Sequence, residues 1–343
     1  MALKNTGLKM MIVACCTILG TLFSSLGAAS AEALRVQVLP GNIASLYAYI
    51  GVSRGFYKKQ GLDVELISMA NGPQANSALV SRSVDVIMNM PDNMILLKQR
   101  GVDTVAVVGN AVQYPFFLIA RNDVESPAPG SDYAAVLKGL KSRTVGVYGL
   151  GSSTDRFVRQ LEIGADVPED YLHRTPMGGP AQALAGLMTK KLDAVADVFS
   201  TGILLKQLGV GRIILDCSVS KCPPSIAQGG QMSLAYFVTA SYLKDHAVTL
   251  ARFVRAHEQI DAWMRDPANR PQFIAELKKM LPAPSVDHPE KYYEAVADRS
   301  LAFFGLTVSL QALQAIQQGL METKELPAPM QLESMIWSKA PRR

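Results

Sequence analysis

Short runs of β-branched residues alternate with longer amphipathic segments along most of this 343-residue chain. In the longer segments apolar residues recur every three or four positions, the period of a helix packed on one side. Strands joined through intervening helices need crossover connections, and such connections build a largely parallel, doubly wound α/β sheet. The first series predicts strands at 35–39, 63–67, 84–89 and 104–109, and helices at 45–60, 73–82 and 92–100.

Two extended apolar runs, at 115–122 and 233–239, interrupt this alternation. Two α/β blocks joined by two extended runs predict one lobe inserted into another, with hinge strands near 118–121 and 234–238. We therefore expect residues 32–118 and 236–343 to form lobe I and residues 119–235 to form lobe II. The second series predicts strands at 144–148, 193–199 and 212–216, helices at 154–163 and 181–190, and a purely helical segment from Leu243 that includes 249–264 and 309–321.

The N-terminus has the three parts of a secretory signal peptide. Two lysines come first, Met10–Leu26 is apolar and uncharged, and Ala29-Ser30-Ala31 offers a small-residue cleavage site. We expect residues 1–31 to be a cleavable signal peptide and the mature protein to be periplasmic. Two alternatives remain. One is a retained membrane anchor, because the apolar stretch approaches the ~20 residues that span a bilayer. The other is a lipoprotein, because Ile12–Cys15 has the form of a lipobox.

The formal net charge is +5, and it falls to +3 when the two signal-peptide lysines, Lys4 and Lys9, are subtracted. Such a weak bias, with both signs interspersed, argues against a nucleic-acid-binding surface. Two of the four cysteines also belong to the signal peptide. The remaining pair, Cys217 and Cys222, lies in a loop rich in Ser and Pro. After export this pair either forms a disulfide or stays as two thiols, and an oxidising compartment favours the disulfide.

Four motifs follow one another in a fixed order: Gly55–Leu66 (GFYKKQGLDVEL), Ala78–Val86, Leu140–Ser153 and Gly178–Val195. In this order the chain resembles the periplasmic solute-binding proteins of the nitrate, sulfonate, taurine and thiamine-precursor class. The resemblance implies a type II periplasmic binding protein fold with two lobes and a ligand between them. It also implies an ABC permease in the inner membrane as partner, and we expect the binding protein itself to be a monomer.

Ligands of open α/β sheets bind beyond the carboxyl ends of the strands. That rule selects polar and aromatic residues in several strand-to-helix loops. Ser152 and Ser153 lie in the Gly149–Thr154 loop, where they either contact a ligand, an anion among others, or only cap the following helix. Asp92 and Asp197 suit an amine or amide equally well. The predicted ligand-binding residues are Asn42, Ser45, Tyr47, Asn89, Pro91, Asp92, Tyr114, Gly151, Ser152, Ser153, Gly179 and Asp197.

Enzyme motifs are weak in this sequence. The Gly149-x-Gly151-x-x-Thr154 segment lacks the third glycine of the dinucleotide fingerprint. The Gly51-x-Ser53-x-Gly55 segment matches the hydrolase pattern but lies inside a helical period rather than at a strand-to-helix elbow. The four histidines are not spaced as metal ligands. We therefore expect no catalytic residues, no metal and no cofactor.

These observations predict the substrate-binding component of an ABC importer. Its ligand would be a small solute, with a sulfonate, nitrate or aromatic acid as the anionic candidates suggested by the resemblance. Two alternatives remain open: a sensory binding module of the same fold that works without a permease, and an exported enzyme that acts on a small molecule.

Overall fold

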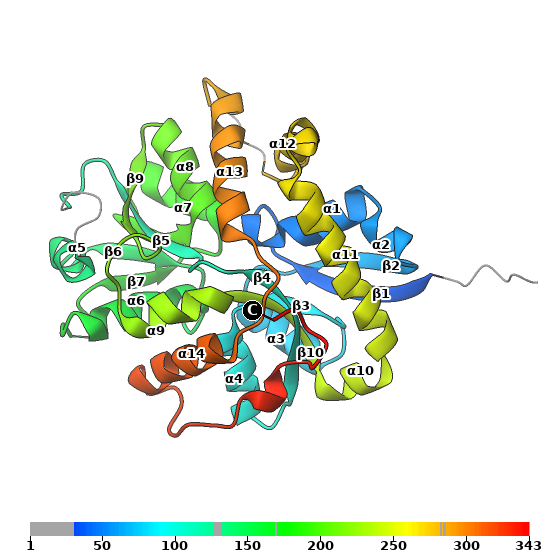
Figure 1. The fold of residues 1–343 in the computed structure, drawn as a ribbon. Helices are drawn as coiled ribbons and strands as arrows, with labels where there is room; N and C mark the ends of the chain where they lie inside the picture. Colours follow the sequence, from blue (N-terminus) through cyan, green and yellow to red (C-terminus); the bar gives the residue numbers. More distant parts are fainter. Residues whose placement is uncertain (1–30, 127–131, 169, 282, 284–285, 343) are drawn as a thin grey trace, which may run out of the picture.

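The computed structural model describes residues 31–126, 132–168, 170–281, 283 and 286–342. The predicted signal peptide lies outside the described residues, except for Ala31. Two α/β halves lie side by side (Figure 1), one built around β1–β4 and the other around β5–β9.

The first half contains β1 (Glu32–Val38) and β2 (Leu62–Ser68), which pair in parallel, and a three-stranded group of β3, β10 and β4. A parallel bridge between Val36 and Val86 connects β1 to the residue just ahead of β3. The strands therefore follow one another in space as β2-β1-β3-β10-β4. The bounds of the second group are β3 Ile87–Asn89, β10 Leu234–Thr239 and β4 Thr104–Ala111.

The second half contains a five-stranded sheet in the order β7-β6-β8-β5-β9. Here β6 is parallel to β7 and β8, whereas β5 is antiparallel to β8 and β9. β5 thus occupies the position in this sheet that β10 occupies in the first. The strands are β5 Phe116–Arg121, β6 Thr144–Val147, β7 His173–Pro176, β8 Ala194–Val198 and β9 Gly211–Asp216.

The predicted α/β class is confirmed, but both sheets are mixed rather than largely parallel. The chain crosses between the halves at 112–115, just before β5, and at 217–233, just before β10. Each strand that follows a crossing enters its new sheet antiparallel to its neighbours. The hinge strands predicted near 118–121 and 234–238 are therefore interior strands of the two sheets, and the crossings lie immediately ahead of them.

The helix predicted at 45–60 is divided in two, because Gly55 adopts a φ of +71° that interrupts the helical backbone. Helices of the first half are α1 Leu46–Ser53, α2 Phe56–Lys59, α3 Gly72–Val80 and α4 Pro91–Gln99. Those of the second half are α5 Tyr133–Gly139, α6 Ser153–Gly164, α7 Pro180–Met188, α8 Phe199–Gln207 and α9 Pro224–Gly229. Short 3₁₀ helices span Ile43–Ser45, Gly230–Met232, Pro267–Asn269 and Glu333–Met335.

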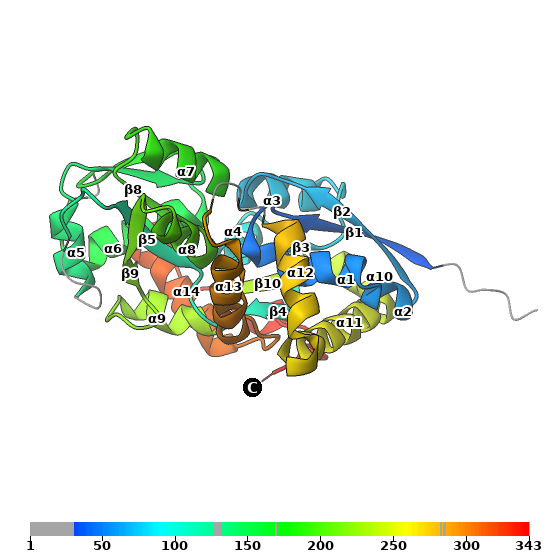
Figure 2. The same cartoon turned by 90° about the horizontal axis from the view of Figure 1, so that it is seen from above.

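The C-terminal helices contact both halves, as Figure 2 shows for α13 and α14. In α13 the Phe303 ring lies 5.3 Å from the Phe199 ring of α8, and α14 packs against α9 on one side and α4 on the other. Buried apolar side chains form one continuous cluster through both halves. The halves are thus closed on each other. The bounds are α10 Ala240–Asp245, α11 Ala247–Arg265, α12 Arg270–Met280, α13 Pro289–Phe303 and α14 Leu310–Glu322.

The returning crossing contains a disulfide between Cys217 and Cys222, whose Cα atoms are 5.5 Å apart. Among the residues that the structure describes, no helix has the length and apolar character needed to cross a bilayer.

Candidate ligand-binding site

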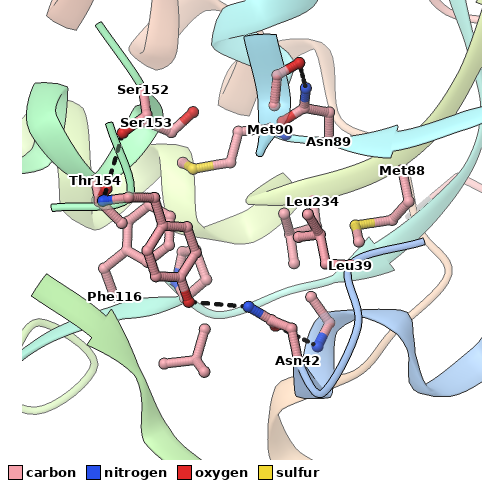
Figure 3. A pocket seen from close by; sticks show the side chains of 15 residues that line it. Leu39, Asn42, Met88, Asn89, Met90, Phe116, Ser152, Ser153, Thr154 and Leu234 are labelled. Carbon is pink, nitrogen blue, oxygen red and sulfur yellow. Dashed lines mark hydrogen bonds between the residues drawn. The ribbon is translucent and has the colours of Figure 1, made fainter. Parts of the chain in front are cut away.

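A cavity of about 40 Å³, here called the inner cavity, lies between the two halves and has room for about three water molecules. Figure 3 shows Ser152, Ser153, Thr154 and Phe116 on one side of it and Leu39, Met88 and Leu234 on the other. None of the 15 lining side chains carries a charge. The polar ones are Asn42, Asn89, Tyr148, Ser152, Ser153 and Thr154.

A larger groove of about 570 Å³, here called the outer groove, adjoins the inner cavity and shares Leu39, Asn42 and Tyr148 with it. Its size falls in the usual range of small-molecule sites, ~300–1,000 Å³. The lining is mostly apolar and, like that of the inner cavity, contains no charged side chain among the residues that the structure describes. The second half and α13 supply most of it, including Gly178, Gly179, Pro180, Ser200, Thr201 and Tyr292.

A chain of hydrogen bonds between the two halves separates the inner cavity from the outer groove. Asn42, in the loop after β1, donates from Nδ2 to the Tyr148 hydroxyl over 2.9 Å. Tyr148, which directly follows β6, donates in turn to Asp197 Oδ1 over 2.6 Å. Asn42 is held in place because its Oδ1 accepts from the Ala44 amide and caps the short helix at Ile43–Ser45. This chain is hereafter called the partition.

Asp197 ends the partition inside the second half. Its side chain is fully buried, and burial raises the pKa of the carboxyl to about 6, although the hydrogen bonds from Tyr148 and the Val198 amide oppose that shift. The Tyr148 pKa is likewise raised, chiefly by burial and then by the negative charge of Asp197. The shared proton of this pair therefore stays on the tyrosine.

A buried ion pair joins the halves beside the inner cavity. Arg156 of α6 donates from Nη1 to Asp92 Oδ2 of α4 over 3.0 Å, and both side chains are only 7% exposed. Ser153 donates to Asp92 Oδ1 over 3.1 Å and accepts from Asn93 Nδ2 over 3.0 Å. Arg156 also donates from Nε to Glu325. With both of these partners, the Arg156 guanidinium is committed to the protein rather than to a ligand.

Asn89 has most of its hydrogen-bonding capacity occupied by the protein. Its Nδ2 donates to the Gly72 carbonyl over 3.2 Å and to Asn76 Oδ1 over 3.3 Å, and its Oδ1 accepts from the Met90 amide over 2.9 Å. Gly72 is required by this packing, since a Cβ there would lie 2.8 Å from the Asn89 amide atoms. Asn89 thus aligns the N-terminus of α3 with that of α4.

Of the predicted site residues, Asn42, Asn89, Ser152 and Ser153 line the inner cavity and Gly179 lines the outer groove. Ser152 also caps α6, because its hydroxyl accepts from the Asp155 amide over 3.4 Å. Capping and cavity lining, which the sequence left as alternatives, therefore coincide at this residue.

The remaining predicted residues lie around the cavities rather than on their walls. Pro91 opens α4 beside Asp92, and Gly151 is exposed with a φ of +74°. Ser45 is turned inward, where its hydroxyl accepts from the Leu39 amide. The aromatic pair lies in the core: the Tyr47 hydroxyl donates to Asp261, and the Tyr114 ring packs on Phe157 at 5.2 Å.

Tyr148 is the principal residue that the sequence reasoning missed. It was assigned as the last residue of a predicted strand, yet it lines both cavities and forms the middle of the partition. The rule that ligands lie beyond strand ends already pointed at this position. Tyr292 had no comparable signal, because α13 reaches the outer groove from the distant C-terminal segment. In the part of the chain that the structure describes, no three His, Cys, Asp or Glu side chains gather as metal ligands.

Comparison with known proteins gives a family and a fold. A family model described as NMT1/THI5 like matches residues 42–269. The putative binding protein YtlA of Bacillus subtilis (strain 168) is 23% identical over 244 residues. That match covers 68% of this chain and 66% of YtlA, slightly less than two thirds of the relative's length.

Two solved structures illustrate the fold. The periplasmic aliphatic sulphonate binding protein SsuA from Escherichia coli superposes with a TM-score of 0.69 at 19% identity, covering 91% of this chain and 94% of SsuA. The periplasmic nitrate-binding protein NrtA from Synechocystis PCC 6803 gives a TM-score of 0.67 at 15% identity, covering 88% and 83%. The predicted periplasmic binding protein fold is confirmed.

Proposed function

Because this chain belongs to the NMT1/THI5-like family, we propose that it is the exported substrate-binding component of an ABC importer and captures a small solute between two lobes. The observation that carries the proposal is the inner cavity, which is lined by side chains from both halves and bordered by hydrogen bonds between them. The names of YtlA, SsuA and NrtA, all binding proteins, support a binding role over an enzymatic one.

In this proposal the first lobe is residues 32–111 with the chain from 234 onward, and the second lobe is residues 116–216. The boundaries predicted from the sequence, 118/119 and 235/236, fall inside β5 and β10, each of which belongs to a single sheet. The hinge is formed by the two crossings, 112–115 and 217–233, because only these segments and the C-terminal helices connect the sheets. Opening would separate Asn42 from Tyr148 and Asp92 from Arg156. A ligand that contacts both lobes at once binds the closed form better than the open form, in which it can contact only one lobe. It therefore shifts the equilibrium toward the closed form.

The acceptor-rich end of a solute, including a small anion, would bind at the N-terminus of α6. There Ser152, Ser153 and Thr154 line the inner cavity, and the helix dipole favours negative charge. Ser153 already donates to Asp92, so the donor for the solute is whichever hydroxyl of the Ser152–Thr154 pair does not donate to the other. Arg156 does not contribute a free cation, since Asp92 and Glu325 occupy it. This fits a singly charged or uncharged solute better than a multiply charged one.

The proposed setting is the periplasm, with an ABC permease as the partner that receives the solute and a monomeric binding protein. A sensory role without a permease would use the same cavity. The two roles differ in genetic context, because a transport protein is expected beside genes for a permease and an ATPase.

Solution scattering tests the proposal directly. The radius of gyration would be measured with and without nitrate, alkanesulfonates, benzoate and pyrimidines. We expect at least one compound to make the protein more compact and to raise its melting temperature, because binding adds RT ln(1 + [L]/Kd), about 2.7 kcal/mol at a hundredfold excess over Kd. An unchanged radius and melting temperature across the whole set would refute ligand capture by closure, and turnover of any compound would favour the enzyme alternative.

A further inference from the structure

Two buried polar atoms beside the outer groove have no hydrogen-bond partner among the described residues. They are Asp197 Oδ2 and Thr201 Oγ1. Asp197 is fully buried and Thr201 is 4% exposed. The Thr201 hydroxyl is close enough to the Asp197 carboxyl to lower its pKa, but the two groups do not meet the geometry of a hydrogen bond. Asp197 Oδ2 and the Thr201 hydroxyl thus lie near each other, and each can form a further hydrogen bond.

Thr201 belongs to the lining of the outer groove, and Asp197 lies directly behind residues that line the two cavities. Thr201 and its neighbour Ser200 line the outer groove, in the first turn of α8. Asp197 lies immediately before Val198, which lines the inner cavity, and accepts from Tyr148, which lines both. Tyr292 of α13 also lines the outer groove. Burial is the main cause that raises its pKa, and the nearby charge of Asp197 raises it further, so the Tyr292 hydroxyl lies within electrostatic range of Asp197.

No cationic side chain of the described residues pairs with the Asp197 carboxylate. The ion pairs of the described residues do not include Asp197, and the lining of both cavities is uncharged. A buried carboxylate without a cation or a full set of hydrogen bonds is costly, and a donor that supplies the missing bond recovers much of that cost. Val198 and Tyr148 both donate to Oδ1, so Oδ2 is the oxygen with free capacity.

We propose that the outer groove is a subsite for an N–H-bearing nitrogen group of the solute, with a protonated amine or amidine preferred, which donates to Asp197 Oδ2 and to Thr201 Oγ1. This inference rests on the proposed binding function and assigns the chemistry of one end of the ligand. Its apolar body would lie against Pro180, Leu184, Leu204 and Tyr292, which line the same groove. The inner cavity would then receive the other, acceptor-rich end at the start of α6.

The test uses three probes of nearly equal size: benzamidine, benzamide and benzoate. Binding to the full-length mature protein at pH 7.5 would be measured by isothermal titration calorimetry and by thermal shift. We expect affinity to fall in the order benzamidine, benzamide, benzoate. Asp197→Asn should weaken benzamidine binding about 10- to 100-fold, because it replaces a charged acceptor by a neutral amide. Thr201→Val should weaken the binding severalfold through loss of the hydroxyl.

Two controls keep the result interpretable. Asp63→Asn removes an exposed carboxyl from β2 in the other sheet and should leave all three affinities unchanged. Asp197→Asn retains Oδ1 as an acceptor for Tyr148 and Val198, so it should fold, and Thr201→Val is a second variant that leaves the carboxylate in place. Benzamidine that binds no better than benzoate, or that binds Asp197→Asn as well as wild type, would overturn the nitrogen subsite.

The measurements distinguish an error in the nitrogen subsite from an error in the proposed binding function. If anions still compact the protein while no nitrogen probe binds, the subsite is wrong and the proposed function stands. If neither the probes nor the anions change the radius of gyration or the melting temperature, both are wrong.

Discussion

Arg156 and Asp92 form an ion pair that connects α6 of the second half to α4 of the first, with 3.0 Å between Nη1 and Oδ2 and both side chains nearly inaccessible. Such a pair contributes mainly through the penalty for breaking it, since removal of one partner leaves the other charge buried.

Arg156→Met should therefore destabilise the protein by about 3–5 kcal/mol, measured as the free energy of unfolding in urea. The double variant with Asp92→Asn should recover part of that loss, because no uncompensated carboxylate remains. Arg270→Met is the matched control: its ion pairs with Glu294 and Asp298 are exposed and should contribute at most about 1 kcal/mol. Equal losses for Arg156→Met and Arg270→Met would contradict this account of the interface.

Tyr148→Phe should shift the protein toward the open form. The substitution removes the hydroxyl that accepts from Asn42 and donates to Asp197, at a cost of about 0.5–1.5 kcal/mol per hydrogen bond. We expect a larger radius of gyration without ligand and a weaker affinity for any solute that closes the lobes. Tyr133→Phe removes a hydroxyl that donates to the Gly164 carbonyl within the second half; this variant is the control and should leave the radius unchanged. A Tyr148→Phe protein as compact as wild type would exclude the partition as a closing contact.

Gly72→Ala should disturb the inner cavity, because Gly72 lines this cavity and packs directly against Asn89. The new Cβ would lie 2.8 Å from both amide atoms of Asn89, so the amide must move and lose its bond to the Gly72 carbonyl. We expect a loss of about 1–3 kcal/mol in the free energy of unfolding. Gly149→Ala meets no atom within 4 Å and is the matched control. Equal melting temperatures for the two variants would show that the contact at Asn89 relaxes freely.

The pH dependence of stability should change in Asp197→Asn. The folded-state pKa of Asp197, about 6, lies above its ordinary value of 3.8, so ionisation opposes folding above pH 6 and the penalty disappears as the pH falls toward 4. His257 acts in the opposite direction. Burial lowers its pKa from 6.5 to about 4, so the stability present above pH 6.5 is lost as the pH falls through this range.

Wild type should thus show a shallow profile between pH 4.5 and 7.5, because the two groups oppose each other. Asp197→Asn should be more stable than wild type at pH 7.5, and this advantage should shrink by about 2 kcal/mol at pH 4.5. Urea unfolding at the two pH values measures the difference. A constant offset between the two proteins would show that Asp197 titrates as an ordinary carboxyl.

Many strands and helices could be predicted from the sequence, because the pattern of apolar residues along the chain reflects which side chains are buried. The strands predicted at 104–109 and 193–199 correspond to β4 and β8, which are buried along their whole length and therefore appear in the sequence as runs of apolar residues. The β7 strand, His173–Pro176, was missed because it is a polar, mostly exposed edge strand with no alternation. Helix α8 was missed for a related reason: its first turn, Phe199–Gly202, is buried on all sides and so shows no helical period.

Strand direction and side-chain partners could not be predicted in the same way. Periodicity is identical for parallel and antiparallel strands, so nothing in 116–121 or 234–239 indicated that β5 and β10 run against their neighbours. The strand-end rule selected Asn42, Asn89, Ser152 and Ser153, and all four line one cavity in the structure, although their role in ligand binding stays a prediction. The rule did not show that Arg156 is already occupied by Asp92, because that depends on how close two helices from different halves approach.

The interior positions of β5 and β10 have a consequence for how the chain acquires its structure. During synthesis the first sheet has a gap between β3 and β4 that is filled only after residues 234–239 have emerged, more than 120 residues later. The N-terminal third therefore cannot complete its hydrogen-bonded ladder alone and should stay susceptible to proteases until the second half is made. Cutting the gene at residue 115 should yield two insoluble fragments rather than two small domains.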